Sequence, residues 1–237
     1  MKKVFKLTAL LLLVGALVMG CKGDAGEKYY GNWTSDVEFW DFDDSFTTRN
    51  GSTFTYELPN PLTNWGRIVA SGSIASNYYS ATKQKKYTGF KASATCNSAN
   101  GNPGFTFCWT SRENPDYVEG GDEPKYLSKY NYMLIGGRDS ILIGEIIEGE
   151  RTYITGTSTN PWQKCSSLKA MPQENEFVVY TDKNGDIKVV VNGVEFTTIS
   201  NPNLTVGGVG FIESLDADIQ AENQTTKITY KFKEFQY

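Results

Sequence analysis

Two Asn-Gly pairs constrain the fold of this chain more than any other feature of its sequence. Asn184-Gly185 lies between the runs Glu176–Thr181 and Ile187–Val191. Asn192-Gly193 then lies between Ile187–Val191 and Val194–Ile199. Asn and Gly tolerate the positive φ angles that a tight two-residue hairpin turn requires. The sequence therefore predicts three consecutive antiparallel strands in this region.

Strand signals of the same kind recur along the rest of the chain. Short runs rich in β-branched and aromatic residues alternate with turn residues, which is typical of strands joined by loops. These runs are Phe54–Leu58, Gly89–Thr95, Phe105–Thr110, Tyr130–Ile135, Ser140–Ile147, Thr152–Thr155, Gly208–Ile212 and Lys227–Phe235. Helix signals are scarce, and Cys165–Ala170 offers at most one short turn. The sequence predicts an all-β, two-sheet antiparallel β-sandwich.

The first 20 residues are interpreted as an export signal rather than as part of the fold. Lysines at positions 2, 3 and 6 precede the mostly apolar run Leu7–Met19, whose 13 residues fall short of the roughly 20 that span a bilayer. The run ends at Val18-Met19-Gly20-Cys21, which resembles a bacterial lipobox. The resemblance implies cleavage before Cys21 and lipid modification of Cys21. The alternative is an ordinary secretory signal followed by a coincidental cysteine.

The charge balance changes when segment 1–20 is removed. Three of the 23 basic residues and none of the 27 acidic residues lie in it, so the remaining chain has a formal charge of −7. Such a chain is not expected to bind nucleic acid or to lie flat on an anionic membrane. The sequence predicts a lipid-anchored flexible tether over residues 21–30 and a single sandwich domain over residues 31–237. We expect a cell-envelope protein, held at the outer membrane or cell surface by palmitate or a similar lipid on Cys21.

The chain contains no histidine. This excludes Ser-His-Asp and Cys-His nucleophile pairs, zinc sites that use histidine, and an imidazole acid or base. Carboxylates, Lys, Tyr or an oxygen-ligated calcium site are the chemistry that remains.

The order of several segments resembles the concanavalin A-like lectin/glucanase jelly roll, over residues 85–237. The segments are Tyr87–Ala94, Gly104–Phe107, Tyr130–Ile135, Glu176–Val179, Asp186–Gly193 and Gly207–Phe211, followed by a last strand rich in Lys and Phe over Ile228–Tyr237. The resemblance implies a jelly-roll sandwich that binds or cleaves sugars.

Glu145 and Glu150 are the candidate catalytic carboxylates under this resemblance. Retaining glucanases of this kind carry Glu-x-Asp-x-x-Glu on one strand, which places nucleophile and helper on the same face. Here the central Asp is replaced by Ile147, and Gly149 predicts a turn next to Glu150. We therefore expect a strand that ends in a solvated acidic turn, and the hydrolase remains an alternative.

No cofactor or metal is expected, with Ca²⁺ as a minor alternative. Asp182–Asp186 resembles the start of a calcium loop but lacks Gly at the sixth position and a distal Glu, and it is already accounted for as a hairpin turn. A second acidic cluster, Asp41, Asp43 and Asp44, is interpreted as a solvated run.

Aromatic side chains are the other candidate chemistry, because flat rings stack on sugars. Phe105, Phe107 and Trp109 alternate on one face and are assigned to the core, and Tyr130 and Tyr132 also share a face. Five aromatics in loop-like contexts are the candidate ligand-binding residues: Trp65, Tyr78, Tyr79, Tyr117 and Trp162.

Three cysteines follow Cys21 in the chain. Cys96 and Cys108 flank a stretch with Asn-Gly and Asn-Pro-Gly turn signals, which predicts a disulfide across a hairpin; two buried thiols are the alternative. Cys165 is then a lone buried cysteine, or it pairs with one of the other two.

Three functions are compatible with these features. The favoured one is a membrane-anchored surface lipoprotein with a non-catalytic, lectin-like domain for a glycan. The first alternative is a glycoside hydrolase that uses carboxylates near Glu145. The second is an adhesin or surface antigen that binds a host protein.

Overall fold

The structure is a computed structural model that describes residues 28–40, 46–58, 73–83, 86–98, 101–121, 125–136, 139–216 and 225–237. The chain divides into two compact units, residues 1–30 and residues 31–237. Of the first unit only residues 28–30 are described. The second unit carries all fifteen described strands, β1–β15.

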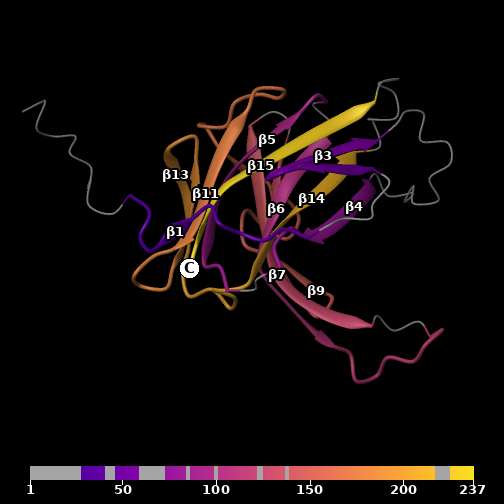
Figure 1. Ribbon diagram of the computed structural model, residues 1–237. Helices are drawn as coiled ribbons and strands as arrows, with labels where there is room; N and C mark the ends of the chain where they lie inside the picture. The colour runs from indigo at the N-terminus through magenta and orange to yellow at the C-terminus, as the bar shows by residue number, and fades with distance from the viewer. Residues whose placement is uncertain are drawn as a thin grey trace, which may run out of the picture. The chain divides into compact units, whose positions relative to one another are not determined.

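The first sheet has eight strands (Figure 1). Their order across the sheet is β13 (Val194–Ile199), β12 (Ile187–Val191), β11 (Asn175–Thr181), β5 (Gly89–Cys96), β15 (Thr226–Gln236), β3 (Thr53–Leu58) and β2 (Thr47–Asn50), with the short β1 (Trp33–Thr34) also pairing with β15.

The second sheet has seven strands. Their order is β10 (Gln163–Lys164), β8 (Ser140–Ile147), β7 (Tyr126–Ile135), β6 (Gly101–Glu113), β14 (Gly208–Asp216) and β4 (Ser73–Ser80), with β9 (Glu150–Tyr153) also pairing with β8. Pairing is antiparallel throughout both sheets, and the described residues contain no helix. The predicted all-β, two-sheet antiparallel β-sandwich is confirmed.

The three strands expected around the Asn-Gly pairs form β11, β12 and β13. Asn192 and Gly193 have φ angles of 50° and 83°, as the turn between β12 and β13 requires. In the turn before β12, the carboxylate Oδ1 of Asp182 accepts hydrogen bonds from the backbone amides of Asn184 (2.8 Å) and Asp186 (3.1 Å). Asp182 therefore closes a hairpin turn.

The core lies between the two sheets and is rich in phenylalanine. Fully or almost fully buried rings from both sheets meet there: Phe54, Phe90, Phe105, Phe107, Phe177, Phe211 and Phe232. Phe105 lies 5.2 Å from Phe90 and 5.5 Å from Phe177, measured between ring centroids, which joins the two sheets. The core positions predicted for Phe105 and Phe107 are confirmed.

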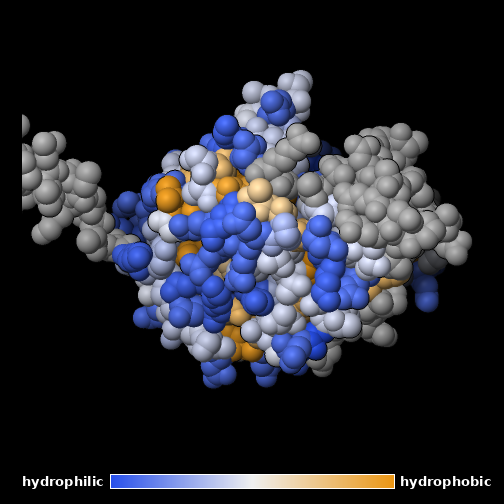
Figure 2. All heavy atoms as spheres, turned by 90° about the horizontal axis from the view of Figure 1, so that it is seen from above, coloured by the Kyte–Doolittle hydropathy of each residue, from blue (hydrophilic) through white to orange (hydrophobic). Residues whose placement is uncertain are grey.

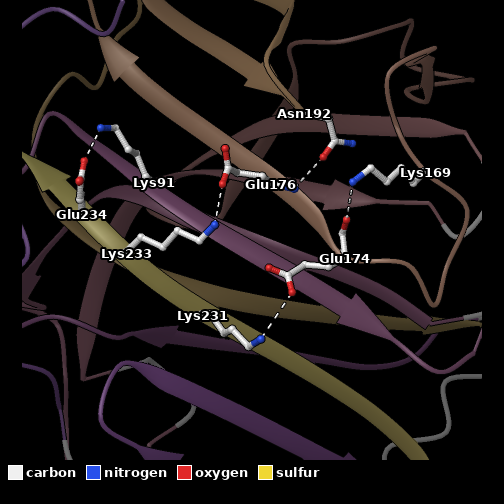
Figure 3. A network of polar contacts seen from close by, with 8 residues as sticks. All are labelled: Lys91, Lys169, Glu174, Glu176, Asn192, Lys231, Lys233 and Glu234. Carbon is white, nitrogen blue, oxygen red and sulfur yellow. Dashed lines mark hydrogen bonds and ion pairs between the residues drawn. The ribbon is translucent and has the colours of Figure 1, made fainter.

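The outer face of the first sheet carries paired charges across β5, β11 and β15 (Figure 3). Lys231 pairs with Glu174 at 3.4 Å, Lys233 pairs with Glu176, and Lys91 pairs with Glu234. Such exposed pairs contribute little stability each, but they keep this face solvated. Hydrophilic side chains also cover most of the view in Figure 2, with small apolar patches between them.

The expected Cys96–Cys108 disulfide is absent: Cys96, Cys108 and Cys165 are all free and buried. The segment between Cys96 and Cys108 crosses from one sheet to the other and does not form a hairpin. Cys96 ends β5 in the first sheet, and Cys108 lies seven residues into β6 in the second. At about 3.3 Å per residue, Cys108 lies more than 20 Å along β6 from the first residue of that strand, Gly101. A disulfide needs the two Cα atoms within about 7 Å of each other.

Within the described ranges, no helix is long and apolar enough to cross a membrane. Cys21 and segment 1–20 lie outside those ranges. In the described part of the chain, no three Cys, Asp or Glu side chains are grouped to hold a metal ion. Asp41, Asp43 and Asp44 lie outside the described residues.

Candidate binding site

A second apolar cluster lies on the outer face of the seven-stranded sheet, away from the core. Along β7, Met133 and Ile135 belong to the core, whereas Tyr130, Tyr132 and Leu134 belong to this cluster. The split follows from the alternation of side chains along a strand. We call the cluster the outer aromatic cluster; it comprises Trp109, Tyr130, Tyr132, Leu134, Leu142, Ile146, Tyr153, Trp162 and Ile212.

Trp109 reaches this face because β6 contains a β-bulge. Gly210 of β14 is paired with Thr106 and Gly208 with Trp109, so Phe107 and Cys108 together lie opposite the single residue Val209. Cys108 has a φ angle of 57°. The extra residue reverses the alternation, as bulges do. Phe107 therefore points into the core and Trp109 points outward, so the core position predicted for Trp109 is wrong.

Gly207 makes room for the bulge. A Cβ atom at position 207 would lie 2.4 Å from the carbonyl carbon of Cys108 and 2.5 Å from the backbone nitrogen of Trp109. These are backbone atoms, which cannot rotate away. The sequence needs glycine here so that the start of β14 can pass close to the bulged strand.

Trp109 lies flat on Tyr130. Their ring centroids are 4.3 Å apart and the ring planes differ by 4°. Tyr130 is 5% exposed and forms the floor of the cluster, while Trp109 is partly exposed above it. The stack therefore supports a flat, partly exposed ring.

Tyr132 forms the rest of the floor, together with a glycine on the next strand. Gly144 is paired with Tyr132, and a Cβ atom at position 144 would lie 2.5 Å from the phenol oxygen. The Tyr132 ring therefore lies across β8 at the point where β8 has no side chain. Arg151 of β9 approaches from the same side, with its guanidinium carbon 5.9 Å from the Tyr132 ring centroid.

Trp162 is a predicted ligand-binding residue that belongs to the outer aromatic cluster. The loop before it is held by Thr155, whose hydroxyl donates to the Pro161 carbonyl (2.8 Å) and accepts from the Ile143 amide (2.8 Å). The Trp162 ring lies against Gly136, where an added Cβ would be 3.3 Å away. The ring is thus fixed at the end of the β7–β8 hairpin.

Of the other aromatic candidates, Tyr117 has a described side chain, and it does not belong to the outer aromatic cluster. Tyr117 is 37% exposed in the turn that follows β6. The backbones of Tyr78 and Tyr79 lie in β4, paired with Ile212 and Phe211, and their side chains are not described. Trp65 lies outside the described residues.

Glu145 points away from the outer aromatic cluster. Its register partner on β7 is Asn131, an inward position. Glu145 is 7% exposed, and its carboxylate accepts a hydrogen bond from Asn203 Nδ2 at 2.9 Å. Asn131 beside it donates to the Leu204 carbonyl at 3.3 Å. Together they fasten the loop before β14 to the inner side of the sheet.

Glu150 is exposed at the start of β9, paired with Ile147, and so lies on the same side of the sheet as Glu145. Glu148, which lies between them in the sequence, forms ion pairs with Arg112 (3.1 Å) and Lys129 (3.2 Å). Hydrogen bonds from Lys129 and then Arg112 hold the pKa of the Glu148 carboxyl below its usual value. This acidic segment is a charged turn that braces β6, β7 and β8.

Cys108 lies behind the outer aromatic cluster. Its thiol is buried, which raises its pKa to about 12, and a hydrogen bond with Asn131 opposes this rise only in part. The thiol therefore stays protonated, and it has the properties of an inert core residue rather than of a nucleophile.

Sequence reasoning missed Trp109, Tyr153 and Arg151 as residues of this face. The alternation of Tyr130 and Tyr132 was a correct signal for a shared face. The bulge that adds Trp109, and the pairing of β9 with β8 that adds Tyr153, leave no comparable pattern in the sequence.

Comparison with known proteins gives a fold-level likeness. No family model matches the chain, and no curated protein matches it. A solved glycosidic hydrolase matches at 11% identity and a TM-score of 0.49, covering 86% of this chain and 89% of that one. The β-glucanase of Bacillus licheniformis matches at 10% identity and a TM-score of 0.47, and the match covers 89% of this chain and 95% of that one. The carbohydrate-binding module CBM66 of Bacillus subtilis matches at 9% identity and a TM-score of 0.40, and the match covers 86% of this chain and 94% of that one.

Proposed function

We propose that this protein is a lipid-anchored, non-catalytic glycan-binding protein. The observation that carries the proposal is the flat stack of Trp109 on Tyr130 at the centre of the outer face of the second sheet. Sugar rings present C–H groups on their flat sides, and aromatic rings bind such surfaces with large apolar contact areas.

The position of the cluster supports a binding role rather than a packing role. The core between the sheets is already filled by phenylalanines from both sides. Trp109, Tyr153 and Trp162 add partly exposed rings on the opposite face, where each packs against the same buried cluster. A contiguous apolar patch of this kind on a solvated protein marks an interaction site.

Binding without cleavage is supported by the residues that the strands present at this face. Tyr130 and Tyr132 of β7, Ile146 of β8 and Ile212 of β14 occupy the outward positions around Trp109. Glu145, the carboxylate favoured for hydrolysis, is engaged with Asn203 on the other side of the sheet. A sugar that lies on the cluster would be separated from Glu145 by the sheet itself.

The anchor is part of the same proposal. Cys21 carries the lipid, residues 21–30 form the tether, and the sandwich lies at the outer membrane or cell surface. The lipobox-like Val18-Met19-Gly20-Cys21 supports this assignment.

A polysaccharide array probed with the full-length protein tests the function. Retention on at least one polysaccharide, without release of reducing ends, is the expected result. Release of reducing ends that Glu145→Gln abolishes would instead establish a hydrolase. Absence of retention on every polysaccharide would favour the adhesin alternative.

A further inference from the structure

The outer face of the second sheet continues beyond the sheet on a two-stranded arm. The arm consists of Thr110–Glu113 of β6 paired with Tyr126–Lys129 of β7. In Figure 1 the strand labelled β7 extends away from the rest of the sheet, past the label of β9. Alternation along β7 places Tyr126 on the same face as Tyr130 and Tyr132. Tyr126 is 52% exposed, so an accessible ring lies on the arm in line with the outer aromatic cluster.

A cation lies over an aromatic ring at each end of this line. The ammonium of Lys125 is 5.6 Å from the centroid of Tyr126, and the guanidinium carbon of Arg151 is 5.9 Å from that of Tyr132. Both cations are on exposed residues. Tyr126 and Tyr132 are six positions apart on β7, which is about 20 Å along a strand. The line is too long to be covered by one sugar ring.

Charged residues lie on both faces of the arm. On the opposite face, Arg112 and Lys129 both pair with the carboxylate of Glu148. On the face of Tyr126, register places Glu113 beside that ring. A guanidinium can bind a carboxylate or sulfate with two parallel hydrogen bonds, and it also favours the faces of aromatic rings.

We propose that the outer aromatic cluster binds a segment of an anionic polysaccharide laid along β7, with its acid groups at Arg151 and Lys125. This inference rests on the proposed glycan-binding function and adds the chemical class and the path of the ligand. Bulk attraction does not account for such a preference, because the chain carries a formal charge of −4. The recognition is local, and it combines stacked rings with two placed cations.

Affinity electrophoresis of the full-length protein with paired polymers tests the inference. One pair is polygalacturonate and its full methyl ester, and the other is dextran sulfate and dextran. We expect at least one acidic polymer to bind about tenfold more tightly than its neutral partner, as one charge-assisted contact provides. A preference for polygalacturonate identifies a carboxylate ligand, and one for dextran sulfate identifies a sulfate ligand. The preference should disappear in the double variant Arg151→Gln/Lys125→Gln.

The matched control is Arg112→Gln/Lys129→Gln, which removes the same charge from the opposite face of the arm and should keep the preference. A preference that survives in the Arg151/Lys125 variant overturns the inference. Equal binding of acidic and neutral partners, or retention of neutral polysaccharides only, also overturns it and leaves the proposed function intact. Absence of retention on every polysaccharide of the array overturns both.

The path of the ligand is tested separately by competition against the bound acidic polymer. An oligosaccharide of that polymer long enough to reach both cations should compete, and its monosaccharide should not. Equal competition by the monosaccharide would place the acid group at one cation only and overturn the extended path.

Discussion

Trp109 lies flat on Tyr130, with 4.3 Å between the ring centroids and 4° between the ring planes. The two residues come from adjacent strands, and they meet on the outer face only because β6 gains one extra residue at Cys108. A strand without the bulge would turn Trp109 toward the core. The candidate site therefore depends on a local irregularity in one strand.

Trp109→Ala should weaken glycan binding about 30-fold, since truncation of an aromatic anchor costs ~2 kcal/mol or more. Trp109→Phe keeps a ring and should retain most of the affinity. Affinity electrophoresis against a polysaccharide retained on the array measures both. The matched control is Trp33→Ala, which removes a tryptophan from the first sheet, where Lys91 lies over its ring at 4.3 Å. Equal losses in the Trp109 and Trp33 variants would contradict the assignment of the site.

Gly207→Ala should destabilise the fold by about 3 kcal/mol, the upper end of the cost of overpacking. The added methyl group meets backbone atoms of Cys108 and Trp109 at 2.4–2.5 Å. Gly51→Ala is the control, because Gly51 has a φ angle of 59° and open space around it, so only the backbone cost of about 1 kcal/mol applies. Urea unfolding measures both variants. A cost at position 207 no greater than that at position 51 would show that the bulge tolerates a side chain there.

The sequence predicted the features of the fold that depend on local patterns. The Asn-Gly pairs identified the β11–β12–β13 hairpins, because positive φ angles are a local requirement. The alternation of Tyr130 and Tyr132 identified a shared face, because strand periodicity is local too. Trp109 was misplaced because a simple period of two carries no information about a bulge.

Features that depend on which sheet a strand joins were not predictable in this way. Cys96 and Cys108 are separated by turn signals that read as a hairpin, but the segment crosses between the two sheets. Glu145 occupies an inward position because its strand presents Gly144 and Ile146 on the face of the aromatic cluster. The faces are defined only when β7, β8 and β9 are paired.

No thiol should react with Ellman's reagent at pH 8 in the folded Cys21→Ser protein, and three should react after unfolding. Cys96, Cys108 and Cys165 are free and buried, and the pKa of Cys108 is raised to about 12. A control variant, Ser158→Cys, places a thiol at an exposed position and should react at once. A count of one thiol after unfolding would instead establish a disulfide.

Cys21→Ser should release the domain from the membrane, because the lipid is the proposed anchor. Fractionation of expressing cells should move the protein from the membrane pellet to the soluble fraction. The variant must remain folded, which thermal unfolding of the released protein checks. Retention of the Cys21→Ser variant in the membrane would contradict lipid anchoring at this residue.

Acidification should weaken the brace that Glu148 provides between β6, β7 and β8. Lys129 and Arg112 hold the pKa of Glu148 below its usual value in the folded protein. The carboxylate therefore contributes stability above its unfolded pKa of about 4.3, and this contribution is lost as the pH falls through the lower folded pKa. At pH 7 the free energy of unfolding of Glu148→Gln should be lower than that of the wild-type protein. In acid the two values should converge.

The cause of the lowered pKa is tested by NMR titration of the Glu148 carboxyl. Lys129→Gln should raise the pKa of Glu148 more than Arg112→Gln does, because the hydrogen bond from Lys129 is the largest cause of its lowering. Glu150→Gln changes an exposed neighbour at the start of β9 and serves as the control for the stability measurement. Linkage requires the stability difference between Glu148→Gln and wild type to shrink as the Glu148 carboxylate is protonated. A difference that stays constant from neutral to acidic pH would show that the ion pairs of Glu148 do not couple its protonation to folding.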